Sequence, residues 1–231
     1  QGWINTMDST SNVRGAPPFI QASVSGACNT LVTAPCCANA KIATFTGPGS
    51  FTVTAAALCA ANNIVSHLIV AGGGSGGTGC SGGGAGAGGF REVKSPITPY
   101  TASPLDGYST PANRVTVTAQ TYAIVVGGGA PGQATAPNSC NSDGTRGNNS
   151  SFGGIISTGG GAGGDGPAGP EGPGGSGGGG GHSSGTAGNG NTPPVSPAQG
   201  FNGRPSQPAT GPAPSDAGGA GGGATAAGTC G

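Results

Sequence analysis

The two histidines are the residues of this sequence that could act as a general acid or base near neutral pH. His67 lies inside the apolar run IVSHLIV, and His182 lies in a glycine-rich stretch without a neighbouring carboxylate. A general base needs a partner within hydrogen-bond reach, and a histidine in an apolar strand is more often a packed structural residue. No GxSxG motif stands between a strand and a helix, as a hydrolase nucleophile requires. We therefore expect a protein that is not an enzyme.

Two loop-like stretches imitate ligand sites. The run GGGSGGTG at 72–79 resembles a phosphate loop, but no GK[ST] follows and no helix is expected after it to bind an anion. The stretch NSDGTRGNNS at 141–150 contains Asp143-Gly144, yet it lacks the alternating acidic ligands of a calcium loop. The sequence predicts no metal site and no cofactor.

Covalent modification is a different kind of chemistry that the sequence supports. The run Asn148-Asn149-Ser150-Ser151 contains two overlapping N-x-[ST] sequons, which predict N-glycosylation at Asn148 and Asn149. Serines and threonines also gather around prolines, as at 192–197 and 205–215, where O-linked sugars would fit.

The chain contains seven cysteines, without CxxC or zinc-finger spacing. Disulfides are the expected use in a secreted chain. Because seven is odd, one thiol stays free or pairs with another chain, and the connectivity remains open. We expect at least three intrachain disulfides, with two of the cysteines anchoring glycine segments, Cys80 and Cys230. The seven are Cys28, Cys36, Cys37, Cys59, Cys80, Cys140 and Cys230.

Composition narrows the classes of partner. Of 231 residues, 54 are Gly and 20 are Pro, while Lys plus Arg and Asp plus Glu number 7 each. This balance gives no basic patch for nucleic acid, and the scarcity of charge suits a protein that assembles or carries sugar. The chain begins at Gln1, and its only Met is Met7. We read this as a processed, secreted or cell-surface protein, and no apolar run is long enough for membrane insertion.

The hydrophobic pattern predicts short strands. Six runs are rich in Val, Ile, Thr and aromatic residues and tend to alternate, which indicates a small antiparallel β-sandwich. One short run, Ala55 to Ala61, is the only helical candidate. The strand candidates are Lys41 to Thr46, Ser50 to Thr54, Ile64 to Val70, Arg114 to Thr118, Thr121 to Val126 and Ser151 to Ser157.

The first part of the chain differs from the rest, and we divide the sequence into an N-terminal arm at 1–40 and a glycine-rich domain at 41–231. The arm has one extended candidate, Phe19 to Ser25, too short to be stable alone. We expect it to complete a neighbouring subunit's sheet, the alternative being an edge strand on its own sandwich. The assembly residues would be Trp3, Phe19, Ile20 and Val24.

The glycines recur with a period of three, the repeat of the polyproline II helix. Such helices make no internal hydrogen bonds, so their amides must pair with neighbours, and glycine allows the close approach. We expect a bundle of polyglycine II helices, with collagen and a disordered spacer as the alternatives. The packing glycines are Gly73, Gly76, Gly79 and Gly82, and Gly160, Gly163, Gly166, Gly169, Gly172, Gly175, Gly178 and Gly181.

The order of these motifs resembles a known family. FTGPGSFTV at 45–53, IVSHLIVAGGGSGG, GGGAGAGGF, RVTVTAQTYAIVVGGGAPG, SFGGIISTGGGAGG and GNTPPVSPAQG are similar to the glycine-rich (polyglycine II) domain of phage tail-fibre and adhesin-like proteins and environmental extracellular fibre proteins. The resemblance spans about 41–231. It implies a β-sandwich joined to polyglycine II loops, a role in attachment or fibre building, and no catalysis. The cysteines depart from the phage pattern.

We therefore expect an all-β protein, a small antiparallel β-sandwich joined to a polyglycine II bundle, with almost no α-helix. The expected function is that of a structural subunit in a secreted, self-assembling extracellular filament or surface fibre, with possible glycan or cell-surface contacts. The alternative is a binding module, either a phage-type adhesin tip or an ice-binding protein.

Overall fold

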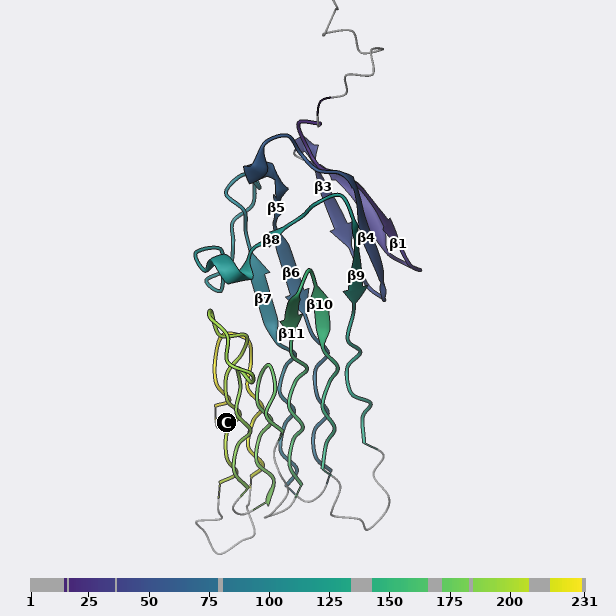
Figure 1. Cartoon of the computed structure of the whole chain (residues 1–231). Helices are drawn as coiled ribbons and strands as arrows, with labels where there is room; N and C mark the ends of the chain where they lie inside the picture. Colours follow the sequence, from purple (N-terminus) through teal and green to yellow (C-terminus); the bar gives the residue numbers. More distant parts are fainter. Residues whose placement is uncertain are drawn as a thin grey trace, which may run out of the picture.

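The computed structural model describes residues 15, 17–35, 37–78, 81–133, 143–165, 172–182, 185–207 and 217–229. Short strands gather at one end of the molecule, and glycine-rich segments run side by side away from them (Figure 1). Antiparallel sheets with almost no helix confirm the predicted fold class.

One layer of the sandwich is a five-stranded antiparallel sheet. Its order is β1-β4-β9-β10-β11, so strands distant in the sequence are neighbours. The strands alternate residues that face the core with residues that face solvent, as expected for a sheet with one covered face. They are β1 (Gln21–Ser25), β4 (Gly49–Ala55), β9 (Thr121–Val125), β10 (Ser150–Phe152) and β11 (Ile155–Ser157).

The remaining strands form three antiparallel pairs. Two of these pairs supply residues that face the five-stranded sheet, while the hairpin β2–β3 follows directly after β1. The pairs are β2 (Thr30–Ala34) with β3 (Cys37–Thr44), β5 (Ile64–Val65) with β8 (Val115–Thr116), and β6 (His67–Val70) with β7 (Phe90–Val93).

The core of the sandwich is small and aliphatic at its centre. Val53, Val115 and Val117 are at most 4% exposed, and aromatic rings pack around them. The Phe152 ring lies edge-on to Phe51, Tyr122 and His67, with centroid separations of 5.9 to 6.0 Å. Edge-to-face ring pairs are the favoured aromatic geometry. The contact of His67 on β6 with Phe152 on β10 joins the two layers.

The structure corrects the expected arm. β1 pairs with β4 of its own chain, and Ile20 and Ala22 pack on the core, so this strand belongs to its own sandwich. The predicted boundary at residue 40 falls within β3, which pairs with β2, and the division into two domains stays a prediction. Burial of Ile20 and Ala22 explains why the strand closes its own sheet. Trp3 lies outside the described residues.

Two further expectations about local structure need revision. The helical candidate Ala55 to Ala61 is instead the end of β4 and the start of a 3-10 turn at Ala60–Asn63. The strands β2 and β7 were not predicted. β7 was missed because Arg91 and Glu92 stand at its centre, and both are nevertheless buried in the fold.

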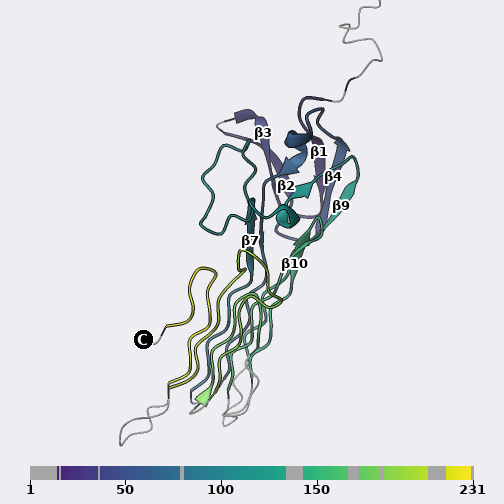
Figure 2. The same ribbon diagram turned by 60° about the vertical axis from the view of Figure 1, so that its left-hand side comes forward.

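The glycine segments form a bundle of extended rods that continue the strands (Figures 1 and 2). The rods bond to one another mainly through backbone amides and carbonyls, and a few side chains add further bonds, such as Ser75 of rod 1 with Thr145 of rod 4. The described rods are rod 1 (71–78), rod 2 (81–89), rod 3 (127–133), rod 4 (143–149), rod 5 (158–165), rod 6 (175–182), rod 7 (185–190), rod 8 (200–207) and rod 9 (217–223).

Hydrogen bonding in the bundle repeats every three residues. In rod 2, the amides of Gly83, Gly86 and Gly89 all donate to rod 5, at 2.7 to 2.9 Å. The amides of Gly84 and Ala87 donate to rod 9 instead, at 2.8 and 3.1 Å. Successive residues thus face different neighbours, and every third residue faces the same one, as in a polyproline II helix. This confirms the predicted lateral pairing of the glycine segments.

The glycine run from 160 to 181 is not one continuous helix. Its two halves, rods 5 and 6, run parallel and bond to each other, since the Gly161 amide donates to Ser176 and the Gly164 amide to Gly179. The amides of rods 2, 5 and 6 find acceptors within one chain, which is the arrangement of a folded bundle and not of a three-chain collagen helix.

Candidate functional site

Rod 6 lies at the centre of the bundle. Its amides donate to rods 2, 5 and 8, and its carbonyls accept from rods 5, 7 and 9. The amides of Gly177 and Gly180 bond to Phe201 and Arg204, while their carbonyls accept from Gly222 and Gly219. A Cβ atom added at any of Gly177 to Gly181 would collide with the backbone of a neighbouring segment. This explains the uninterrupted glycine run at 177–181.

The close spacing makes glycine necessary at most predicted packing positions. A Cβ atom at Gly163 would collide with the backbone of Gly83, and one at Gly178 with the Ala162 carbonyl. Gly73 has room, its nearest neighbour being 3.9 Å away, and Gly76 is tight at 3.2 Å. The remaining described packing positions collide with backbone as well, at Gly82, Gly160, Gly172, Gly175 and Gly181. Gly79, Gly166 and Gly169 lie outside the described residues.

A buried glutamine fixes the joint between the sandwich and the bundle. Gln199 is fully buried, and its side-chain oxygen accepts the Thr158 amide at 2.9 Å while its side-chain nitrogen donates to the Pro193 carbonyl at 3.0 Å. Its backbone carbonyl accepts the Phe90 amide at 2.8 Å, at the start of β7. One residue thus bonds to a rod, a strand and a loop. Sequence reasoning did not single out Gln199, because a lone glutamine carries no periodic signal.

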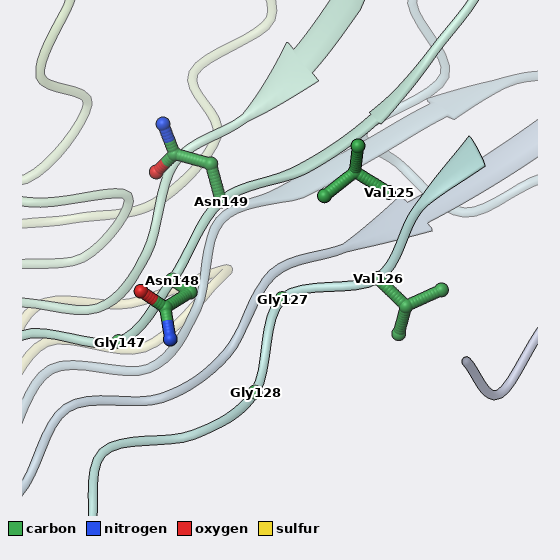
Figure 3. A pocket seen from close by; sticks show the side chains of 7 residues that line it. All are labelled: Val125, Val126, Gly127, Gly128, Gly147, Asn148 and Asn149. Atoms are coloured by element: carbon green, nitrogen blue, oxygen red, sulfur yellow. The ribbon is translucent and has the colours of Figure 1, made fainter. Parts of the chain in front are cut away.

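An open groove lies where β9 and β10 pass into rods 3 and 4 (Figure 3). This groove is open to solvent and has a volume of about 540 Å³. Backbone glycines form much of its wall, and the Asn148 and Asn149 side chains stand at it. The lining residues are Val125, Val126, Gly127, Gly128, Gly147, Asn148 and Asn149.

The structure distinguishes the two sequons. The Asn149 side chain is hydrogen-bonded within the fold, because its oxygen accepts the Gly159 amide at 2.9 Å. Asn148 is exposed, and its side chain makes no hydrogen bond in the described part of the chain. Ser150, the third residue of the Asn148 sequon, is buried and accepts the Gly127 amide at 2.9 Å. Glycosylation at either asparagine stays a prediction.

Three of the seven cysteines lie in the described residues, and the structure gives no support to the expected disulfides. Cys28 and Cys59 are exposed free thiols. Cys37 is half-buried in β3. The other four cysteines, Cys36, Cys80, Cys140 and Cys230, lie outside the described residues.

The polar side chains of β7 are buried in hydrogen-bonded surroundings. A nitrogen of the Arg91 guanidinium donates to the Asn113 side chain at 2.6 Å, and burial lowers the pKa of Arg91. On the opposite face, Glu92 accepts the backbone amide of Ser103 at 2.9 Å. Burial, followed by the nearby Glu92 carboxylate, raises the pKa of Tyr100 to about 12. These groups hold the loop at 94–106 on the sandwich.

The two histidines lie in different parts of the molecule, His67 in the sandwich and His182 in the bundle. His67 packs against Phe152 in the core, where neither ring nitrogen makes a hydrogen bond. His182 ends rod 6, and its backbone amide donates to Ser81. No group of three His, Cys, Asp or Glu suited to a metal ion occurs among the residues that the structure covers. Among the same residues, no helix is long and apolar enough to cross a bilayer.

A β-sandwich whose strands continue into a hydrogen-bonded glycine lattice defines a class of all-β, glycine-rich proteins. The chain belongs to the glycine-rich domain family, which matches residues 45–231. The match begins within the stretch that connects β3 and β4, and it covers the bundle and most of the sandwich. No curated protein and no solved structure matches the chain.

Proposed function

We propose that this chain is a structural subunit of an extracellular filament or surface fibre that self-assembles. The main support for this proposal is an exposed aliphatic pair on the hairpin β2–β3. Val32 and Ile42 are direct partners in the ladder, and they are 50% and 47% exposed. Burying such a pair against another subunit would remove apolar surface from water, which favours association.

Other features of the sandwich support the same proposal. Leu68 and Val70 lie on one face of β6 and are 58% and 52% exposed. The whole chain carries only 14 charged residues, so little electrostatic repulsion opposes contact between copies. The bundle, whose rods are held by backbone bonds, would act as a rigid element within the fibre.

Electron microscopy of the purified chain tests this proposal. We expect negative-stain images to show filaments, and the double variant Val32→Lys with Ile42→Lys to abolish them while keeping the wild-type melting temperature. Thr116→Lys is the matched control, because Thr116 is an exposed strand residue on β8. A wild-type chain that stays dispersed at every concentration would rule the fibre out.

A binding module of the adhesin or ice-binding kind is the second candidate. Rows of hydroxyls cross the outer face of the five-stranded sheet, where Ser25 bonds to Ser50 at 2.7 Å and Thr52 to Thr121 at 3.1 Å. A regular array of hydroxyls would suit a hydroxyl-rich ligand such as a glycan or ice. Binding of the monomer to a glycan array or to ice crystals, lost on Thr52→Val with Thr121→Val, would favour this candidate over the fibre.

A further inference from the structure

Rod 3 keeps glycines that this chain alone does not require. A Cβ atom at Gly128 or Gly132 would meet no atom within 4 Å, and one at Gly129 would come no closer than 3.6 Å to Gly73. None of the three has the left-handed backbone that favours glycine. At most other rod glycines a Cβ would collide with backbone. The glycine content of rod 3 therefore exceeds what its own neighbours demand.

The same rod leaves backbone donors unpaired. The Ala130 amide donates to Gly73 of rod 1 at 2.9 Å, whereas the amides of Gly128, Gly129 and Gly132 make no hydrogen bond in the part of the chain that the structure describes. All three glycines are exposed. Rod 6 contrasts with this, because it bonds to neighbours around its whole circumference. Rod 3 is thus an unpaired edge of the lattice, comparable to the edge strand of a sheet.

From these observations we propose that rod 3 docks against rod 3 of a second copy of this chain, as a two-fold lateral dimer. Gly127 and Gly128 of rod 3 line the groove together with residues of rod 4 (Figure 3). Pairing of antiparallel rods already occurs within the chain, between rods 1 and 2 and between rods 4 and 5. A two-fold axis would repeat that geometry between copies.

The composition of the two outer edges favours a second rod 3 as the occupant. Rod 3 carries no charged residue, so two copies can approach without repulsion. The segment after rod 9 carries side chains at 224–227, Ala-Thr-Ala-Ala, which would hold a partner rod further away. Every third residue of a rod faces the same way, so Gly129 and Gly132 share one face of rod 3. Because both sides of a close rod contact need glycine, this face is best matched by the same face of a second copy.

The test compares two variants in sedimentation velocity. Gly128→Val combined with Gly132→Val places branched side chains on rod 3 at positions where an added Cβ meets no atom within 4 Å, so we expect the fold to survive with an unchanged melting temperature. We expect dimerisation to weaken by at least about tenfold, since several amide hydrogen bonds are lost. Gly15→Val is the matched control, because a Cβ at Gly15 also meets nothing within 4 Å, and it should dimerise as the wild type does.

Hydrogen exchange gives the direct readout of the contact. Amides at 128–132 should exchange more slowly in the wild-type dimer than in the diluted monomer. Unchanged exchange there, or wild-type dimerisation by the double valine variant, would overturn the proposal even if filaments form. A dimer lost in that variant, without filaments at any concentration, would support this edge and reject the fibre.

Glycosylation is the competing occupant of the groove, because a glycan on Asn148 would fill it. Intact-mass measurement of the dimeric fraction separates the two. The docking requires an unmodified Asn148 in the dimeric fraction, so a sugar on Asn148 in dimeric protein would overturn it.

Discussion

The side-chain oxygen of the fully buried Gln199 accepts the backbone amide of Thr158 at 2.9 Å. Thr158 is the first residue after β11, where the chain leaves the sandwich and enters rod 5. The neighbouring Ser157 hydroxyl donates to the Gly89 carbonyl, where rod 2 meets β7. Specific side chains therefore define the joint, although the rods themselves are held by backbone.

Replacing Gln199 should weaken the whole molecule. Gln199→Leu keeps much of the volume but leaves the Thr158 amide and the Pro193 carbonyl without partners. A buried group left unpaired costs about 1–3 kcal/mol, and Pro193 is exposed, so we expect the free energy of unfolding to fall by about that amount, mainly through the Thr158 amide. Urea unfolding followed by circular dichroism measures it. Gln207→Leu, at an exposed position, is the control and should change stability little.

Glycines inside and at the edge of the bundle should respond oppositely to the same substitution. Gly163→Ala forces a methyl group against the backbone of Gly83, and overpacking of this kind costs about 1–3 kcal/mol or more. Gly132→Ala meets open space and restricts the unfolded chain, so it should be neutral or stabilise by up to about 1 kcal/mol. Equal melting temperatures for the two variants would contradict the lattice.

Acid should destabilise the sandwich through His67. Burial lowers the pKa of His67 below 6.5, with the Arg91 charge acting in the same direction and the Val65 backbone opposing it. The unfolded chain then binds the proton more readily than the folded one. Stability from the neutral ring is present above about pH 6.5 and declines as the pH falls toward the lowered folded pKa. His67→Phe should reduce the loss between pH 7.5 and 5.5 in urea unfolding, and an identical pH profile would refute this.

The exposed thiols should react in the native protein. We expect iodoacetamide to modify Cys28 and Cys59 without denaturant, because both are free and exposed. Peptide mass spectrometry after alkylation locates the label. Native protein in which both residues remain unlabelled until a reductant is added would instead restore the disulfides expected from the sequence.

The sequence predicts the sandwich well where one face of a strand is buried. Val115 and Val117 face the core while Thr116 between them is exposed, which is the alternation that marked this run. β7 could not be predicted in this way, because Arg91 and Glu92 look like surface residues. They are buried because Asn113 and the Ser103 amide, distant in the sequence, supply hydrogen bonds.

The period of three predicts that the glycine segments pack, but not how. A repeat reports which residues share a face and contains no information on where the chain turns, so the parallel pairing of rods 5 and 6 was not predictable. The three-residue period also identifies only one face of each rod. Gly177 and Gly180 lie on another face of rod 6, and they too must be glycine because neighbouring rods surround rod 6. Conversely, the open surroundings of Gly128 and Gly132 become visible only once the neighbours are placed.

The glycine rods also set how the protein should respond to cooling. Heat-capacity changes on unfolding come from apolar surface, while exposure of polar surface lowers them. Rods built from peptide groups and almost no side chains expose chiefly polar surface when they separate. The bundle should therefore contribute a small heat capacity of unfolding for its length, which flattens its stability curve and leaves it resistant to cold.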